Sequence, residues 1–185
     1  MYLRKILIFS IITFFPVNII AKERNEIINK LKETNSIKFF FIQENEELIE
    51  EGVCIISFPQ KLKCNYNDAK QKEIIINKDK MLITQKRYNK SYFYPVKEFG
   101  FLTILKKDEL IQLIRNSNLD ILDDEIRLHI INKSDQINIS FDKKSFDLKG
   151  WKVRDKFNKV VKVEIKILEK NIFLKDEEFK IELIN

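Results

Sequence analysis

The chain contains only two cysteines, and they stand five residues on either side of Pro59. Cys54 and Cys64 lie in the stretch GVCIISFPQKLKCNY, in which two apolar-rich segments flank the Pro59-Gln60 pair. This pattern predicts two strands joined by a tight turn. Residues whose numbers sum to about 118 then face each other with Cα atoms ~4.5 Å apart, which is within disulfide range. The pair therefore either forms a disulfide or, if the register slips by one residue, remains two small buried side chains.

Other residues that could perform chemistry are few. His129 is the only histidine, and it alternates with Leu128 and Ile130, so we expect it beside Arg127 on the outward face of a strand. Two cysteines and one histidine do not complete a structural zinc site at the usual spacings. The acidic run from 120 to 125 lacks the spacing of an EF-hand loop and indicates a solvated turn. The sequence thus predicts no catalysis, no cofactor and no metal.

The composition indicates one globular domain. The chain has 185 residues, of which 44% are hydrophobic and 34% charged, so disorder is not expected. Only three glycines are present, which argues against glycine-rich phosphate loops. The net charge is +6, but charges of both signs are interleaved along the chain, so we expect no nucleic-acid partner.

The first 21 residues have the features of a secretory signal peptide. Arg4 and Lys5 form a basic start, residues 6–15 are apolar, Pro16 interrupts the run, and the small residue Ala21 precedes the expected cleavage site. The alternative is an uncleaved anchor, but the uninterrupted apolar run is shorter than the ~20 residues that a spanning helix needs. We therefore expect an exported mature domain of residues 22–185. An oxidising compartment would favour the disulfide.

The remaining pattern predicts a mainly antiparallel sheet with few helices. Apolar residues at helical spacing predict a helix over 22–34, and two shorter helices over 99–105 and 110–114, the second with Asp108 as N-cap. A change of alternation near Gly150 predicts a β-bulge. The segments in which apolar residues alternate, and which we expect to be strands, are 37–42, 53–58, 62–66, 73–76, 81–86, 91–94, 126–130, 137–141 and 161–167.

Apolar residues exceed what one thin sheet needs, since the chain has 15 phenylalanines. They form either an ordinary packed core or a concave inner face that holds an apolar ligand under the middle helices. Periodicity alone does not separate these two interpretations.

The stretch that contains the cysteines resembles the LolA family of periplasmic outer-membrane lipoprotein carriers. The family pattern of Gly, alternating apolar residues, Pro and a basic-aromatic alternation ending in Tyr is matched without gaps by Gly52, Pro59, Lys61, Lys63 and Tyr66. SIKFFFIQ resembles the first strand, FGFLTILKK the short helices, and FDKKSFDLKGWKVRDKFNKVVKVEI the C-terminal run. The resemblance implies an open, curved antiparallel half-barrel covered by helices, with a cavity for lipoprotein acyl chains. Family members receive lipoproteins from an inner-membrane transporter and deliver them to an outer-membrane acceptor.

The resemblance also implies specific site residues in a monomeric carrier. The family usually has Arg where this chain has Phe58, and inward-facing aromatics where it has Cys54 and Cys64, so we expect this lid to close by apolar packing. A carrier of another lipid, such as a glycolipid or fatty acid, a lipid hydrolase and a structural protein with a filled core remain as alternatives. The expected cavity residues are Ile37, Phe39, Phe41, Ile56, Phe58, Leu62 and Tyr66, and the expected lid residues are Phe101, Leu102, Leu105, Leu110 and Leu113.

The expected processing is directly testable. N-terminal sequencing of the protein isolated from its own cells should begin at Lys22, because the signal-peptide pattern ends at Ala21. A membrane-embedded product that begins at Met1 would contradict the prediction.

Overall fold

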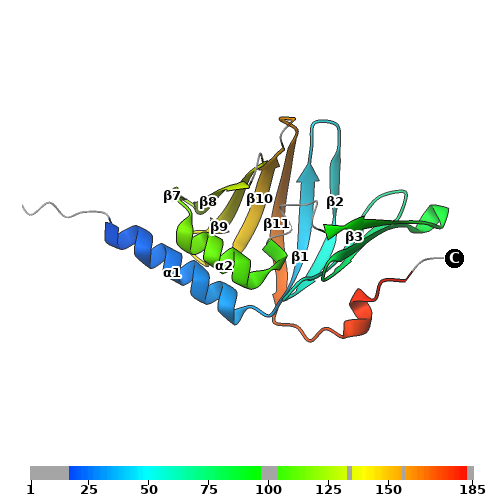
Figure 1. Ribbon diagram of the computed structural model, residues 1–185, viewed down its shortest axis with the longest axis horizontal. Helices are drawn as coiled ribbons and strands as arrows, with labels where there is room; N and C mark the ends of the chain where they lie inside the picture. The colour runs from blue at the N-terminus through cyan, green and yellow to red at the C-terminus, as the bar shows by residue number, and fades with distance from the viewer. Residues whose placement is uncertain (1–16, 97–103, 133–134, 156, 183–185) are drawn as a thin grey trace, which may run out of the picture.

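The fold is one curved antiparallel sheet with two helices on its inner side. The computed structural model describes residues 17–96, 104–132, 135–155 and 157–182. In this part of the chain, eleven strands pair in the order β6-β5-β4-β3-β2-β1-β11-β10-β9-β8-β7, and the two end strands do not meet (Figure 1). The strands are β1 (Ser36–Glu44), β2 (Ile49–Ser57), β3 (Lys61–Tyr66), β4 (Lys72–Asn77), β5 (Lys80–Gln85), β6 (Lys90–Pro95), β7 (Leu119–Ile121), β8 (Glu125–Asn132), β9 (Asp135–Asp142), β10 (Leu148–Arg154) and β11 (Val160–Lys170).

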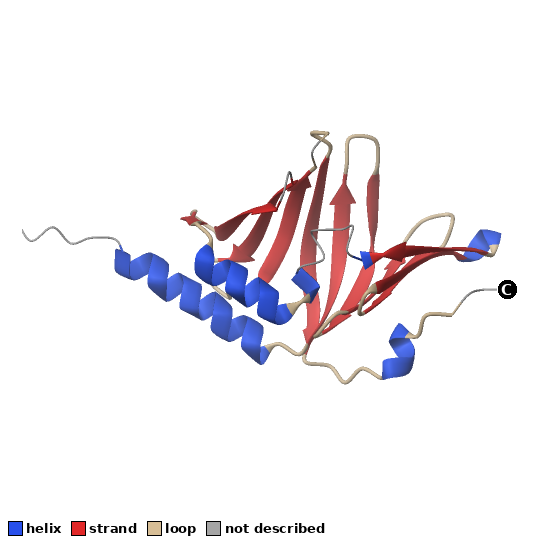
Figure 2. Cartoon of the chain, viewed as in Figure 1, coloured by secondary structure: helices blue, strands red, loops and turns tan. Residues whose placement is uncertain are grey.

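Two helices lie side by side over one half of the sheet. They are α1 (Val17–Glu33) and α2 (Lys107–Asn116), and Figure 2 shows both on the same face. Ile27 of α1 and Ile114 of α2 are fully buried in the core between helices and sheet. The Arg24 guanidinium donates to the carbonyl oxygens of Arg115 and Ser117, which holds the first helix against the end of the second. The predicted mainly-β fold class is confirmed.

Helix bounds differ from the expectations in two places. α1 begins at Val17, before the expected start at residue 22, and no described helix is long and apolar enough to cross a bilayer. Lys106, not Asp108, is the N-cap of α2, so the predicted cap is wrong. Asp108 lies in the first turn instead, where a carboxylate interacts favourably with the helix dipole. The helix expected over 99–105 lies mostly outside the described residues.

The strand register agrees with the pairing predicted for the turn at Pro59-Gln60. Cys54 pairs with Cys64 across β2 and β3, as predicted. The bulge expected near Gly150 is present, because the β9–β10 register shifts between Leu148 and Gly150. A second shift between Lys38 and Phe39 of β1 was not predicted. The sequence pattern gave no signal for it because both faces of this strand carry apolar residues.

The inner face holds the main core, and a smaller apolar cluster lies on the outer face. Residues after β11 lead to the 3-10 helix η4 (Asp176–Phe179), which packs against β3 and β4. Phe179 is buried there, and its carbonyl accepts a hydrogen bond from Asn77. Lys61 Nζ lies 2.6 Å from Asp176 Oδ1 and 5.9 Å from the centre of the Phe179 ring. The C-terminal segment thus covers the part of the outer face formed by β3 and β4.

Gly52 allows a close aromatic contact on the inner face. The rings of Phe41 and Tyr66 meet edge to face with centroids 4.9 Å apart. A Cβ atom on Gly52 would lie 2.8 Å from Phe41 Cε1 and 2.2 Å from the Asn65 carbonyl oxygen. Backbone is on one side and a packed ring on the other, so this position has no room for a side chain.

Replacing Gly52 with Ala should therefore lower the free energy of unfolding by about 1–3 kcal/mol, the usual cost of overpacking. Urea denaturation measures it. Asn65→Ala, at an exposed position on the neighbouring strand, is the control and should stay within about 0.5 kcal/mol of the parent protein. Equal stability of Gly52→Ala and the parent would contradict the packing account.

Candidate functional site

An apolar cavity lies on the inner face of the sheet. Its volume is about 90 Å³, and its lining is almost entirely aliphatic and aromatic. The walls come from β1 to β5 together with β10 and β11, which are neighbours in the curved sheet (Figure 1). The lining residues are Phe39, Phe41, Gln43, Cys54, Ile56, Leu62, Cys64, Tyr66, Ile74, Ile76, Met81, Ile104, Leu105, Trp151 and Val163.

Two buried residues just before α2 close the cavity. Ile104 and Leu105 lie in a 3-10 turn, and the Leu105 side chain is 2% exposed. The Gln60 N–H donates to the Leu105 carbonyl oxygen at 2.9 Å, and the Gln60 carbonyl accepts from the Lys78 N–H at 2.9 Å. Gln60 has a positive φ of 65°. The β2–β3 turn therefore links this lid segment to the β4–β5 turn through backbone hydrogen bonds alone.

Five of the seven expected cavity residues line the cavity: Phe39, Phe41, Ile56, Leu62 and Tyr66.

Ile37 and Phe58 instead line a second cleft of about 20 Å³ between the helices and the sheet. β2 ends at Ser57, so Phe58 belongs to the turn, and its N–H donates to the Asn35 carbonyl oxygen at 2.9 Å. The Phe58 side chain therefore lies beside the end of α1 and not in the cavity.

Phe58 is in apolar and cationic surroundings. It lines the second cleft together with Leu31 of α1 and Leu110 of α2. Lys107 Nζ lies 5.3 Å from the centre of the Phe58 ring, within cation–π range. Partial burial lowers the pKa of Lys107, and the nearby Asp108 carboxylate opposes this shift. Phe58 thus contacts both helices that cover the sheet.

The expected lid residues occupy different positions. Leu105 lines the cavity, Leu110 lines the second cleft, and Leu113 is half-buried against the core. Phe101 and Leu102 lie outside the described residues.

The cysteine pair is part of the cavity wall. Cys54 and Cys64 are joined by a disulfide, with Cα atoms 4.1 Å apart, and both face inward. The bridge fixes β2 to β3 where these strands form the floor of the cavity. Both cysteines are buried, so the bridge contributes apolar surface as well as a covalent link.

One end of the cavity is polar, which the sequence reading missed. Tyr66 Oη lies 3.5 Å from Gln43 Oε1, and Gln43 Nε2 donates to Glu50 Oε2 at 3.2 Å. Lys72 forms an ion pair with Glu50, and its Nζ lies 3.7 Å from the centre of the Tyr66 ring. Burial, followed by the charges of Glu50 and Asp68, raises the pKa of Tyr66 above its usual value, so its hydroxyl stays protonated. We call Gln43, Glu50, Tyr66 and Lys72 the polar end.

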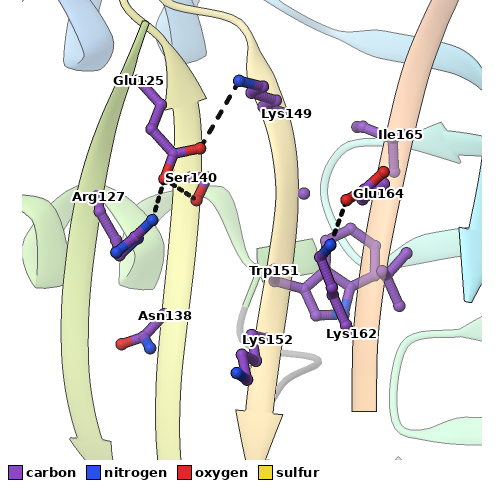
Figure 3. Close-up of a pocket in the computed structure, with 12 residues that line it drawn as sticks. Glu125, Arg127, Asn138, Ser140, Lys149, Trp151, Lys152, Lys162, Glu164 and Ile165 are labelled. Carbon is purple, nitrogen blue, oxygen red and sulfur yellow. Dashed lines mark hydrogen bonds and ion pairs between the residues drawn. The ribbon is translucent and has the colours of Figure 1, made fainter. Parts of the chain in front are cut away.

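A larger hollow on the outer face has a different character. It measures about 560 Å³ and lies over β8 to β11 (Figure 3). Glu125 accepts hydrogen bonds from Arg127 and Ser140 and pairs with Lys149 at 3.7 Å, while Lys162 pairs with Glu164. Charged side chains already paired with one another line it, so its size does not make it a site for an apolar ligand.

His129 also lies on the outer face, as predicted. Its Nε2 is 2.7 Å from Asp120 Oδ2, and its Nδ1 is 2.8 Å from Asn138 Oδ1. Within the described residues, no group of three or more His, Cys, Asp or Glu side chains is placed to hold a metal ion.

Comparison with known families gives a clear result. The family described as outer membrane lipoprotein carrier protein LolA matches residues 32–182. The chain belongs to the LolA family. No curated protein matches the sequence.

Solved structures share the fold at low sequence identity. The crystal structure of MucB superposes with a TM-score of 0.55 and 8% identity, covering 90% of this chain and 64% of that one. The structure of the Pseudomonas aeruginosa MucA/MucB complex superposes with a TM-score of 0.50 and 8% identity, covering 88% of this chain and 61% of the matched one. A DUF1329 family protein from Desulfovibrio piger superposes with a TM-score of 0.51 and 6% identity, covering 90% of this chain and 99% of that one. The chain thus spans less than two thirds of the MucB chains, and at these identities the likeness shows the fold alone.

Removing the disulfide should weaken the fold. A Cys54→Ala/Cys64→Ala variant should lose roughly 2–3 kcal/mol of unfolding free energy, because the bridge closes a short loop in the unfolded chain. Mass spectrometry of the unreduced, alkylated native protein should find a peptide pair joined through these residues. Two alkylated thiols in the native protein would contradict the bridge.

Proposed function

We propose that this protein is a periplasmic carrier that binds the acyl chains of lipoproteins and ferries them from the inner to the outer membrane. The observation that supports this most directly is the apolar cavity on the inner face, closed by Leu105. Membership of the LolA family supports lipid or lipoprotein binding in general. The specific cargo and route are our proposal.

The physical need for such a carrier follows from the cost of exposing acyl chains. Each CH₂ group kept from water contributes ~0.8 kcal/mol, so a multiply acylated protein does not cross an aqueous space unaided. The inner face offers aliphatic and aromatic walls and, apart from the polar end, few groups that would lose hydrogen bonds when a chain enters.

The cavity is small and must enlarge to accept a chain. Its volume of about 90 Å³ is well below the roughly 300–1,000 Å³ of typical ligand pockets. Ile104 and Leu105 occupy the space in which a chain would lie, and one backbone hydrogen bond from Gln60 holds them. Displacement of these residues offsets part of the gain from binding, so the net affinity stays modest and the cargo can be released.

Export and partners belong to the same proposal. The signal-peptide pattern of residues 1–21 supports cleavage and a periplasmic location. The partners we propose are an inner-membrane lipoprotein-releasing transporter and an outer-membrane acceptor, with the carrier acting as a monomer.

A periplasmic carrier of another lipid, such as a glycolipid or fatty acid, is the alternative, because the same apolar walls suit any hydrocarbon chain. Native mass spectrometry of the protein isolated from its own periplasm separates the two. Lipoprotein adducts support the proposal, whereas a glycolipid or fatty-acid adduct supports the alternative.

Replacing Leu105 with Asp should impair binding of a neutral fluorescent apolar dye at least tenfold, because a carboxylate enters the apolar cavity. Unfolding measured in parallel should show a smaller loss, since Leu105 lies in the short lid segment rather than in the sheet. Leu48→Asp, at an exposed turn position, is the matched control and should alter neither property. Proportionate loss of stability and binding would indicate an ordinary core residue.

A further inference from the structure

We propose that the polar end binds the neutral ester or amide linkage of an acylated ligand and disfavours a free fatty-acid carboxylate. This inference rests on the proposed function, since it assigns an orientation and a chemical class to the ligand of the same cavity. In this orientation the hydrocarbon chain lies among the apolar residues and its carbonyl group faces Tyr66.

The hydrogen-bond donor is the Tyr66 hydroxyl. Among the described residues its one hydrogen-bond partner is Gln43 Oε1, at 3.5 Å. This distance exceeds the 2.5–3.0 Å typical of O–H···O hydrogen bonds, so the hydroxyl is weakly engaged. Tyr66 and Gln43 both line the cavity, and apart from the indole N–H of Trp151 the rest of its described lining offers no side-chain donor of N–H or O–H type. The Tyr66 hydroxyl is therefore the donor that we assign to a ligand carbonyl oxygen at this end.

The charges around Tyr66 select against an anion. Glu50 and Asp68 both act electrostatically on the Tyr66 hydroxyl. Lys72 is the nearby cation, and it is already paired with Glu50 and placed over the Tyr66 ring. The Glu50 and Lys72 side chains are only 13% and 18% exposed, so solvent screens them weakly. A ligand carboxylate would be repelled by the Glu50 carboxylate, and the Lys72 ammonium group is already paired. An ester carries no charge and is not repelled.

Tyr66→Phe and Glu50→Gln separate the two parts of the proposal. Phe retains the ring that packs edge to face on Phe41 and lies beneath Lys72, and removes only the hydroxyl. Gln retains the shape of Glu50 and removes its charge. Glu51→Gln is the matched control, because Glu51 is exposed, faces outward and makes the same change of net charge.

The experiment measures displacement of the neutral dye N-phenyl-1-naphthylamine by methyl laurate or by laurate, at neutral pH. Tyr66→Phe should weaken the binding of methyl laurate about fivefold, because it removes one neutral hydrogen bond, while the affinity for the dye changes less than twofold. Glu50→Gln should strengthen the binding of laurate several-fold and leave the affinity for methyl laurate nearly unchanged. Glu51→Gln should match the parent protein with both ligands.

The variants distinguish these effects from simple hydrophobicity, which would favour the ester in every variant by the same factor. Unchanged ester affinity in Tyr66→Phe, together with unchanged laurate affinity in Glu50→Gln, would overturn the inference while dye binding still supported a lipid carrier. Failure of the parent protein to bind dye or either ligand would overturn the proposed function as well.

A further comparison identifies the source of the linkage. A synthetic triacylated lipopeptide and a triglyceride with the same chains both present ester groups. If the proposal holds, both lose affinity in Tyr66→Phe. Tighter binding of the lipopeptide then points to lipoproteins, and tighter binding of the triglyceride points to a free lipid.

Discussion

The inner face of the open sheet sets the constraint on which the rest of the structure depends. Strands on both sides of β1 direct apolar side chains inward, and the sheet does not close on itself. Burial contributes roughly 25 cal/mol per Å² of apolar surface, so this face requires a cover. Over β8 to β11 the cover is α1 and α2, and the core there is packed. Next to β1 to β5, the described part of the cover is the short segment with Ile104 and Leu105, and there a space remains.

The local features of the cavity follow from this division. Gly52 allows Phe41 and Tyr66 to pack closely at one end. The disulfide fixes β2 to β3 at the floor, and its two side chains form part of the wall. The outer face needs no comparable cover on most strands, because its charged residues pair with each other, as Glu125 and Lys149 do. Only near β3 and β4 does a C-terminal residue, Phe179, provide one.

Sequence reasoning was most successful where a pattern is local. Strict alternation in β11 and the symmetry about Pro59 gave the strands and the Cys54–Cys64 register, because side-chain direction has a period of two. It misplaced Phe58, which follows the end of β2 and lines the second cleft, because the strand alternation was extended one residue too far. The polar end was missed because it depends on strand pairing: Gln43 faces Glu50 across β1 and β2, and Lys72 reaches Glu50 from β4. Phe179 gave no clear periodic signal, because the apolar residues after β11 follow no single helical or strand spacing.

The order of the strands has a mechanical consequence. β6 and β7 are the two edges of the sheet, yet they are consecutive strands in the chain, with the lid segment and α2 between them. This connection joins the two edges of the open sheet covalently. Separation of β6 from β7 would stretch this connection, and the hydrogen bond from Gln60 to Leu105 fixes one point of it to the β2–β3 turn. The length of this connection therefore limits how far the two edges of the sheet can move apart.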